Sequence, residues 1–453
     1  MTASPATIAL RRRVRGVTSN EVLRRFIACV LGSLVLALMT GPSGSAEQPT
    51  AGFSGSLLSA HVFPSLGLGL ALFVIITLRR GYDAKIRAVS ERVSALPRLV
   101  MPNRRARYGF YLVLLVAAII VPLHISGYWQ EVLVDQIGIY VLLAMGLNVV
   151  VGYAGLLDLG YIAFYAIGAY ATAFWTGALP IHPVHINAFY AIPLAILAAM
   201  LAGVLLGAPT LRLRGDYLAI VTLGFGEIIQ IVATNLTGIT AGAAGVLGIP
   251  HFAVHLLGVH YVWGVSSLPY YYLLLGFIVI AVIAFHSLEE SRVGRAWSAI
   301  REDEVAAEAS GVNVLKYKVM AFAIGASTSG FAGALTASKI SYITPGSFTV
   351  QLSILILVLV IFGGMGSLPG AIAGAAVLQW LPQLLRVHPL FGFQPPDLYM
   401  YLGALLVVMM IFRPQGLLPS KRRRREILFQ EMGLDKADAL APMNEIGSEG
   451  PSR

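Results

Sequence analysis

The sequence predicts an all-α polytopic membrane protein with about 10–12 transmembrane helices and both termini in the cytoplasm. Its 453 residues are 57% hydrophobic and only 12% charged, whereas a typical soluble domain has about 25% charged residues. Such a chain has too few charged side chains to cover a water-soluble globule. Its apolar runs are continuous and do not alternate with a period of two, which excludes a transmembrane β-barrel.

About twelve runs are long and apolar enough to cross the hydrocarbon layer, and each must be a helix because lipid offers the backbone no hydrogen-bond partners. The predicted spans are 26–40, 63–78, 109–126, 133–154, 160–178, 188–208, 217–234, 270–286, 317–337, 350–366, 370–385 and 398–413. The first run is also compatible with a cleaved signal peptide, because it follows basic residues and precedes the small residues Gly44, Ser45 and Ala46.

The distribution of basic residues predicts the orientation. Lys and Arg gather before the first span, in segments 79–108, 209–216 and 287–316, and in the tail from Arg413 onward. By contrast, segments 41–65, 127–134, 179–187 and 235–269 contain neither residue. Even numbers of spans separate the basic segments, so all of them fall on one side. Basic loops are retained in the cytoplasm, which predicts a multi-pass membrane protein with both termini on the cytoplasmic side.

The sequence argues against catalysis and against a bound cofactor in this chain. A single cysteine, Cys29, excludes multi-cysteine metal sites, and the scattered histidines predict no metal centre. The sequence has no phosphate-binding G-x-x-x-x-G-K-[ST] loop, so ATP hydrolysis by this chain is not expected. The apolar composition also predicts no nucleic-acid partner.

Two glycine-rich breaks interrupt adjoining apolar runs. One contains Gly152 and Gly155, and the other contains Gly363 and Gly366. Small residues allow helices to pack closely, but broken helices also mark transport pathways, and the pattern alone leaves both roles open. Two acidic residues at membrane depth, Asp158 in the first break and Glu227 within span 217–234, are the candidates for polar lining of a pathway or for hydrogen bonds within the bundle.

Segment 287–316 lies between two spans and contains a helix-forming stretch. Residues 295–309 lack Pro and Gly, and Trp297, Ile300 and Val305 can share one apolar stripe. We therefore expect a short amphipathic helix bounded by Gly294 and Gly311. It either covers the bundle or docks a cytoplasmic partner.

Several sequence blocks resemble the permease subunits of branched-chain amino acid ABC importers, in particular the larger type with extra N-terminal spans. The blocks are GLNVVVGYAGLLDLG (146–160), FYAIGAY (164–170), LRLRGDYLAIVTLGFGE (211–227), GRAWSAIREDE (294–304), FAGAL (331–335), PGSF (345–348) and GGMGS (363–367). The resemblance covers about residues 109–418. It divides the chain into an N-terminal extension (1–108) with two spans and a basic linker, a permease core (109–418), and a basic, disordered tail (419–453).

The resemblance implies an ATP-driven importer of Leu, Ile or Val that consists of several chains. The implied partners are a second related permease, two cytoplasmic ATPase subunits that bind ATP and Mg²⁺, a periplasmic substrate-binding protein, and membrane lipid. It also implies that the ATPases dock on a coupling element that contains Arg301, Glu302, Asp303, Glu304 and Gly311. Import of urea, short amides or other amino acids, and ion-coupled secondary transport, remain alternatives.

Overall fold

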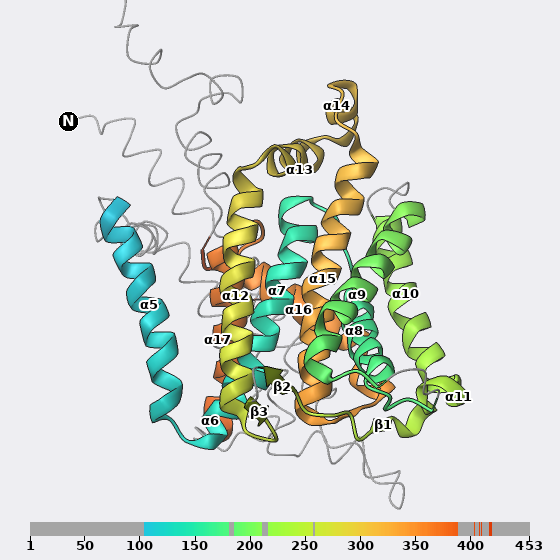
Figure 1. Ribbon diagram of the computed structural model, residues 1–453. Coiled ribbons are helices and arrows are strands. Elements are labelled where there is room, and N and C mark those ends of the chain that lie inside the picture. The colour runs from blue at the N-terminus through green and yellow to red at the C-terminus, as the bar shows by residue number, and fades with distance from the viewer. Residues whose placement is uncertain are drawn as a thin grey trace, which may run out of the picture. The chain divides into compact units, whose positions relative to one another are not determined.

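The computed structural model describes residues 104–180, 185–210, 216–256 and 259–387, together with positions 403, 407, 409 and 416–418. The chain divides into two compact units, residues 1–112 with 389–408, and residues 113–388 with 409–453. Nearly all described elements belong to the second unit, which is a helical bundle (Figure 1). The predicted spans 26–40 and 63–78, most of span 398–413, and the tail lie outside the described residues.

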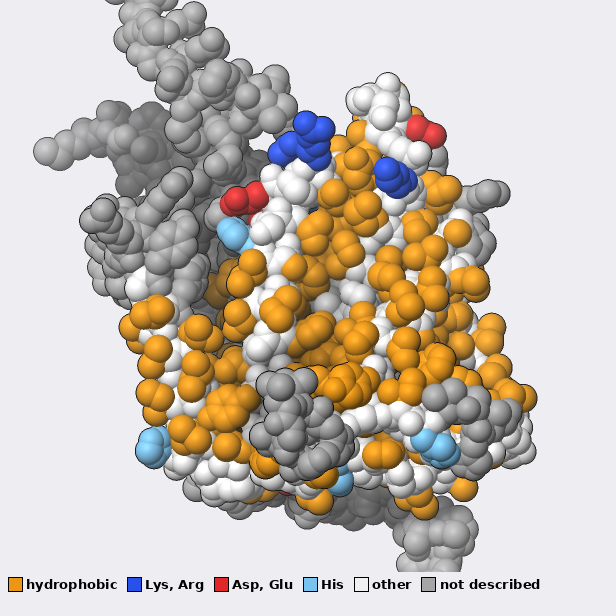
Figure 2. Space-filling view, in the orientation of Figure 1, with side chains coloured by type: hydrophobic (Ala, Val, Ile, Leu, Met, Phe, Trp, Pro, Cys, Tyr) orange, Lys and Arg blue, Asp and Glu red, His pale blue; other side chains and the backbone are white. Residues whose placement is uncertain are grey.

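Among the described residues, six helices are long and apolar enough to cross a membrane, which confirms the predicted all-α polytopic membrane fold. They are Gly127–Tyr153, Ala188–Ala208, Tyr217–Asn235, Ser267–Glu290, Val314–Ile340 and Pro345–Gly363. Two shorter apolar helices, Leu112–His124 and Ile162–Trp175, match the predicted spans 109–126 and 160–178. The hydrophobic side chains cover the broad middle of the bundle surface (Figure 2), as expected for a surface that faces lipid.

The individual helices follow the predicted spans closely. Their bounds are α5 (Arg104–His124), α6 (Gly127–Glu131), α7 (Ile139–Leu147), α8 (Ile162–Trp175), α9 (Ala188–Thr210), α10 (Asp216–Asn235), α11 (Thr237–Thr240), α12 (Ser267–Glu290), α13 (Arg292–Glu302), α14 (Glu304–Ala309), α15 (Val314–Ile340), α16 (Val350–Gly363) and α17 (Leu368–Val387). Two π-helical segments, η1 (Val132–Gly138) and η2 (Asn148–Tyr153), flank α7 and complete the Gly127–Tyr153 span.

Helix α15 forms the core of the bundle, where it packs against α7, α8 and α9. Small residues make this packing possible. A Cβ atom built on Gly168 of α8 would lie 2.4 Å from the backbone oxygen of Gly330 in α15, and one built on Gly203 of α9 would lie 2.8 Å from the Cβ of Ala326. The helices therefore touch backbone to backbone, which is the main way that helices gain dispersion energy in lipid.

Strands occur at the end of the bundle opposite α13 and α14, where the sequence predicted only loops (Figure 1). A hairpin pairs β2 (Ala253–Leu256) with β3 (Val259–Val262), and β1 (Val246–Leu247) pairs with β4 (Tyr342–Ile343). Two short 3₁₀ turns, η3 (Gly242–Ala244) and η4 (Pro345–Ser347), lie beside them. These strands are only two to four residues long, which is too short for a periodic sequence signal.

The backbone contact between α8 and α15 predicts that Gly168→Val destabilises the protein, because the added side chain must displace the Gly330 backbone. Overpacking of this kind costs about 1–3 kcal/mol. The measurement is the midpoint of thermal unfolding of the purified protein in detergent. Gly276→Val is the matched control, because a Cβ on this glycine of α12 has no neighbour within 4 Å. Equal midpoints for the two variants would contradict the packing argument.

Candidate coupling site at one end of the bundle

The element predicted as one amphipathic helix consists of two helices. Helix α13 ends at Glu302, and α14 begins at Glu304. Asp303 between them is extended, and its Oδ1 accepts hydrogen bonds from the backbone N–H groups of Val305 (2.9 Å) and Ala306 (3.0 Å). The expectation of a single helix is therefore wrong, because an aspartate at this position caps a new helix. Helix α14 projects from the end of the bundle, above α15 (Figure 1).

Of the two glycines predicted to bound this element, the structure confirms Gly311 and contradicts Gly294. Gly311 has φ +83°, a left-handed conformation that ends the element after α14, as expected. Gly294 does not precede α13 but lies in its first turn, because Ser291 caps the helix by accepting from the backbone N–H groups of Val293 and Gly294. A Cβ on Gly294 would lie 2.3 Å from the backbone oxygen of Glu289, so the sharp turn from α12 into α13 requires glycine.

The apolar stripe of this element is also divided by the break. Trp297 and Ile300 of α13 are buried at 0% and 5% exposure, and the indole Nε1–H of Trp297 donates to the Tyr317 carbonyl of α15 at 2.8 Å. Val305 of α14 is 57% exposed instead. The change of direction at Asp303 turns Val305 away from the bundle. Helix α13 is therefore anchored to the bundle, and α14 presents an outward apolar side chain.

The side chain of Arg301 joins α13 to the first glycine break. Its guanidinium donates a hydrogen bond to the carbonyl oxygen of Gly152, at the end of η2. A Cβ on Gly155 (φ +73°) would lie 2.6 Å from the Cγ of Arg301, and one on Gly366 would lie 2.9 Å from its Nη1. A larger residue at either position would displace the arginine. Three of the predicted glycines thus surround the predicted coupling arginine.

The same region connects the two glycine breaks to each other. The backbone N–H of Gly366 (φ +78°), in the turn between α16 and α17, donates to the Oδ1 atom of Asn148 at 2.9 Å. Asn148 is fully buried in η2, and its Nδ2 has no partner among the described residues. Gly363 lies apart from this contact, since it packs against the backbone of Gly370 and allows α16 and α17 to approach. Nothing in the local sequence pattern predicted this contact of Asn148.

Two buried lysines of α15 were also missed by the sequence reasoning. Lys318, 1% exposed, forms an ion pair of 2.8 Å with Glu304 at the start of α14. Lys339, near the other end of α15, forms an ion pair of 2.5 Å with Asp135 of η1. Charged residues inside a membrane protein are expected to face a partner of opposite charge. Pairing of Asp135 with a cation was thus predictable in kind, but its partner was not.

The loop that follows η2 ties this region to α10. Asp158 is fully buried, and its Oδ1 accepts from the backbone N–H of Gly160 at 2.9 Å, whereas its Oδ2 has no hydrogen bond among the described residues. The backbone N–H of Leu159, between Asp158 and Gly160, donates to the Oγ1 of Thr222 in α10 at 3.1 Å. A recess of about 120 Å³ is lined by residues 154–157 at the start of this loop and by Arg301, Glu304 and Lys318.

Glu227 lies elsewhere, on the exposed face of α10. Its side chain is exposed, and so are Tyr217, Ile220, Ile228 and Ile231, which repeat at helical spacing on the same side. Helix α10 stands at the edge of the bundle (Figure 1). A carboxylate in the middle of a span is costly to expose to lipid. The Glu227 side chain thus lies outside the core of the described bundle, and we expect a polar cavity or another chain against this face of α10.

Of the remaining predicted coupling residues, Glu302 is exposed at the end of α13, and Asp303 caps α14 as described above. The structure thus brings Arg301, Gly152, Gly155 and Gly366 together, and it leaves Gly363, Asp158 and Glu227 at three other places. No group of three or more His, Cys, Asp or Glu side chains suited to a metal ion occurs among the described residues.

Comparison of this sequence with known proteins points to one family of membrane permeases. Residues 131–412 match the family model described as a permease component of the branched-chain amino acid transport system. The high-affinity branched-chain amino acid permease protein LivM of Salmonella typhimurium is 40% identical over 69% of this chain and 75% of its own length. LivM of Escherichia coli is 38% identical over 78% and 84%. The ribose import permease RbsC of Haemophilus influenzae is 26% identical over 63% and 84%. No solved structure gives a significant match.

The ion pair between α14 and α15 predicts a non-additive effect on stability. Glu304→Ala leaves the buried Lys318 ammonium without its carboxylate and is expected to cost up to about 3 kcal/mol. The double variant Glu304→Ala/Lys318→Met removes both charges and is expected to recover most of this loss. Thermal unfolding in detergent measures both, and Glu308→Ala, an exposed glutamate of the same helix, is the control. Additive losses in the double variant would contradict the pairing.

Proposed function

Because this chain belongs to the family of branched-chain amino acid transport system permease components, we propose that it is the membrane permease of an ATP-driven importer of Leu, Ile and Val. The chain is a transport subunit and not an enzyme. In this proposal ATP and Mg²⁺ are bound by two separate ATPase subunits, and this chain binds no cofactor. The observation that carries the proposal is the match of residues 131–412 to the permease family, and the contact of Arg301 with both glycine-rich breaks supplies the proposed coupling route.

The proposed complex lies in the bacterial inner membrane. The distribution of Lys and Arg supports a cytoplasmic position for the end that carries α13 and α14. The ATPases would dock there on α14, whose exposed Val305 and acidic side chains project from the bundle. A periplasmic binding protein would deliver the amino acid at the opposite end, where the strands lie. Substrate selection would rest largely with that binding protein.

The proposed coupling route begins when the ATPases bind ATP and push on α14. The push reaches α15 through the Glu304–Lys318 ion pair and reaches η2 through the hydrogen bond of Arg301 to Gly152. From η2 it passes along the loop to Thr222 of α10. Direct polar contacts link the elements that are not joined by the chain itself, so we expect a displacement of α14 to reach the first glycine break.

We place the translocation pathway beside the exposed face of α10, between this chain and a second related permease. Glu227 supports this position, because a second chain would enclose its carboxylate in a polar cavity instead of lipid. A zwitterionic amino acid also requires polar groups along its route. Gly224, one turn before Glu227, has no neighbour within 4 Å of a built Cβ, so backbone is accessible on this face. An open backbone is a second source of polar contacts.

The reconstituted chain tests the class of transporter. In liposomes, the chain alone is expected to show no concentrative uptake of radiolabelled leucine, with or without a proton or sodium gradient. The chain together with its second permease, ATPases, binding protein and ATP is expected to concentrate leucine. Uptake by the chain alone, driven by an ion gradient, would establish the secondary-transporter alternative and contradict the proposal. Uptake of urea or a short amide in preference to leucine, by the complete system, would replace the substrate.

Arg301→Ala tests the coupling route. In the assembled transporter, it is expected to lower leucine uptake per ATP hydrolysed by at least about tenfold, because it removes the link between α13 and Gly152. Arg301→Lys retains the charge but not the planar guanidinium and is expected to give an intermediate loss. The control is Arg424→Ala, which removes the same charge from the predicted tail. Normal uptake per ATP in Arg301→Ala would remove this arginine from the route.

A further inference from the structure

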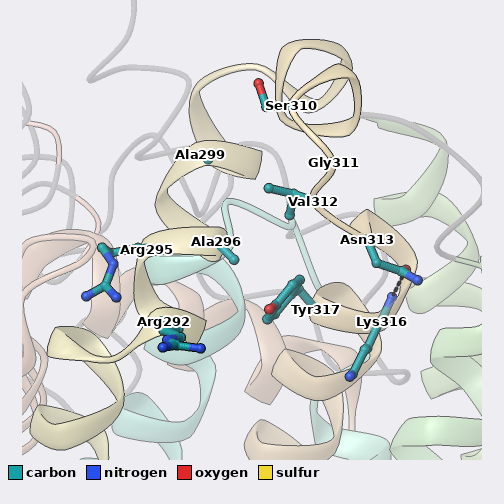
Figure 3. Close-up of a pocket in the computed structure, with 10 residues that line it drawn as sticks. All are labelled: Arg292, Arg295, Ala296, Ala299, Ser310, Gly311, Val312, Asn313, Lys316 and Tyr317. Carbon is teal, nitrogen blue, oxygen red and sulfur yellow. Dashed lines mark hydrogen bonds between the residues drawn. The ribbon is translucent and has the colours of Figure 1, made fainter.

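A basic recess lies between α13 and the start of α15, on the side away from the Arg301 contacts. Its volume is about 490 Å³, within the range of about 300–1,000 Å³ that is typical of small-ligand sites. Three of its lining residues are cations, namely Arg292, Arg295 and Lys316, and none is acidic. Figure 3 shows Arg292 and Lys316 on opposite sides of the recess, with Tyr317 between them.

The charges of this recess are not balanced within the described protein. None of the three cations forms an ion pair with a described residue. Arg295 donates to the backbone carbonyl of Glu290 at 3.2 Å, which leaves its positive charge in place. The first turn of the 27-residue α15 adds the positive end of a helix dipole, and Asn313 caps only the backbone N–H of Lys316. The recess therefore favours an anion.

The position of the recess identifies the kind of anion. The basic side chains of α13 and of the start of α15 lie at the upper edge of the hydrophobic surface of the bundle (Figure 2). Further along α12 toward the opposite end of the bundle, Ile280 and Ile283 are 64% and 63% exposed. Phosphate groups of phospholipids occupy this level of a membrane, and the acyl chains extend over the apolar surface beneath. A soluble anion would gain nothing from that surface.

We propose that this recess binds the phosphate headgroup of an anionic phospholipid, such as phosphatidylglycerol, in the leaflet that faces the ATPases. The guanidinium group of Arg292 is suited to the phosphate oxygens, which it can contact in a bidentate way, and Arg295 and Lys316 add two further positive charges. The side chain of Asn313 lines the same recess and provides a polar partner for a glycerol headgroup. The lipid acts as a clamp between α13 and α15, the two helices that flank the protruding α14.

The test is lipid binding by the full-length chain, measured by native mass spectrometry after delipidation in a mild detergent. Titration with phosphatidylglycerol is expected to give a saturable bound lipid. Arg292→Gln/Arg295→Gln/Lys316→Gln is expected to weaken binding by about fivefold for each charge removed. Arg292→Lys/Arg295→Lys, which keeps the charges, is expected to retain most of the binding. Arg422→Gln/Arg423→Gln/Arg424→Gln removes equal charge from the predicted tail and is expected to change nothing.

Four outcomes would overturn the proposal. The first is equal binding of phosphatidylglycerol by the triple glutamine variant and the unmodified chain, when thermal unfolding shows that both proteins are folded. The second is equal binding of phosphatidylcholine, which would make the site a general lipid contact. The third is displacement of the lipid by millimolar inorganic phosphate, which would make it a site for a soluble anion. The fourth is loss of ATPase co-purification in the triple variant with lipid binding unchanged, which would assign the recess to the ATPase.

Discussion

The hydrogen bond from Arg301 to the carbonyl oxygen of Gly152 is the contact on which the arrangement of this end of the bundle depends. The last carbonyl groups of a helix have no intrahelical donors, and a lipid environment supplies none. Here the donor is a cation on a different element, placed at the negative end of the helix dipole. Glycines at 155 and 366 make the space for it. A carbonyl group in the last turn of the Gly127–Tyr153 span is thus hydrogen-bonded by α13, which belongs to the proposed coupling element.

Helix α15 gives this arrangement its rigidity. Small residues let α8 and α9 pack directly on its backbone, and each of its ends is fixed by a buried ion pair, Lys318 with Glu304 and Lys339 with Asp135. Burying a charge is costly, and breaking only one partner of such a pair costs more than removing both. The pairs therefore determine which segments neighbour the ends of α15, even if they add little net stability.

The sequence predicted what depends on composition and short-range pattern. The helical membrane fold, the bounds of the described spans and the helical segment between α12 and α15 follow from hydropathy, charge and helix propensity. The break at Asp303 was not predicted, because the surrounding residues favour a helix and only the capping geometry reveals the interruption. Asn148 and Lys318 were missed because each acts through a partner distant in sequence. The contact of both glycine breaks with Arg301 was also not predicted, because it joins residues that are distant in sequence.

The break at Asp303 gives the two halves of the element different roles. Helix α13 is fixed to the bundle by the burial of Trp297 and Ile300, whereas α14 exposes Val305 and is joined to the bundle through Glu304. A single continuous helix would pass any displacement on as a rigid tilt of α13 and would disturb the buried tryptophan. With a capped joint between them, a displacement of α14 reaches α13 at its last turn, where Arg301 lies, while the buried Trp297 stays packed. The displacement then divides between α15, through Glu304, and η2, through Arg301, so the two contacts act in parallel and neither carries the whole load.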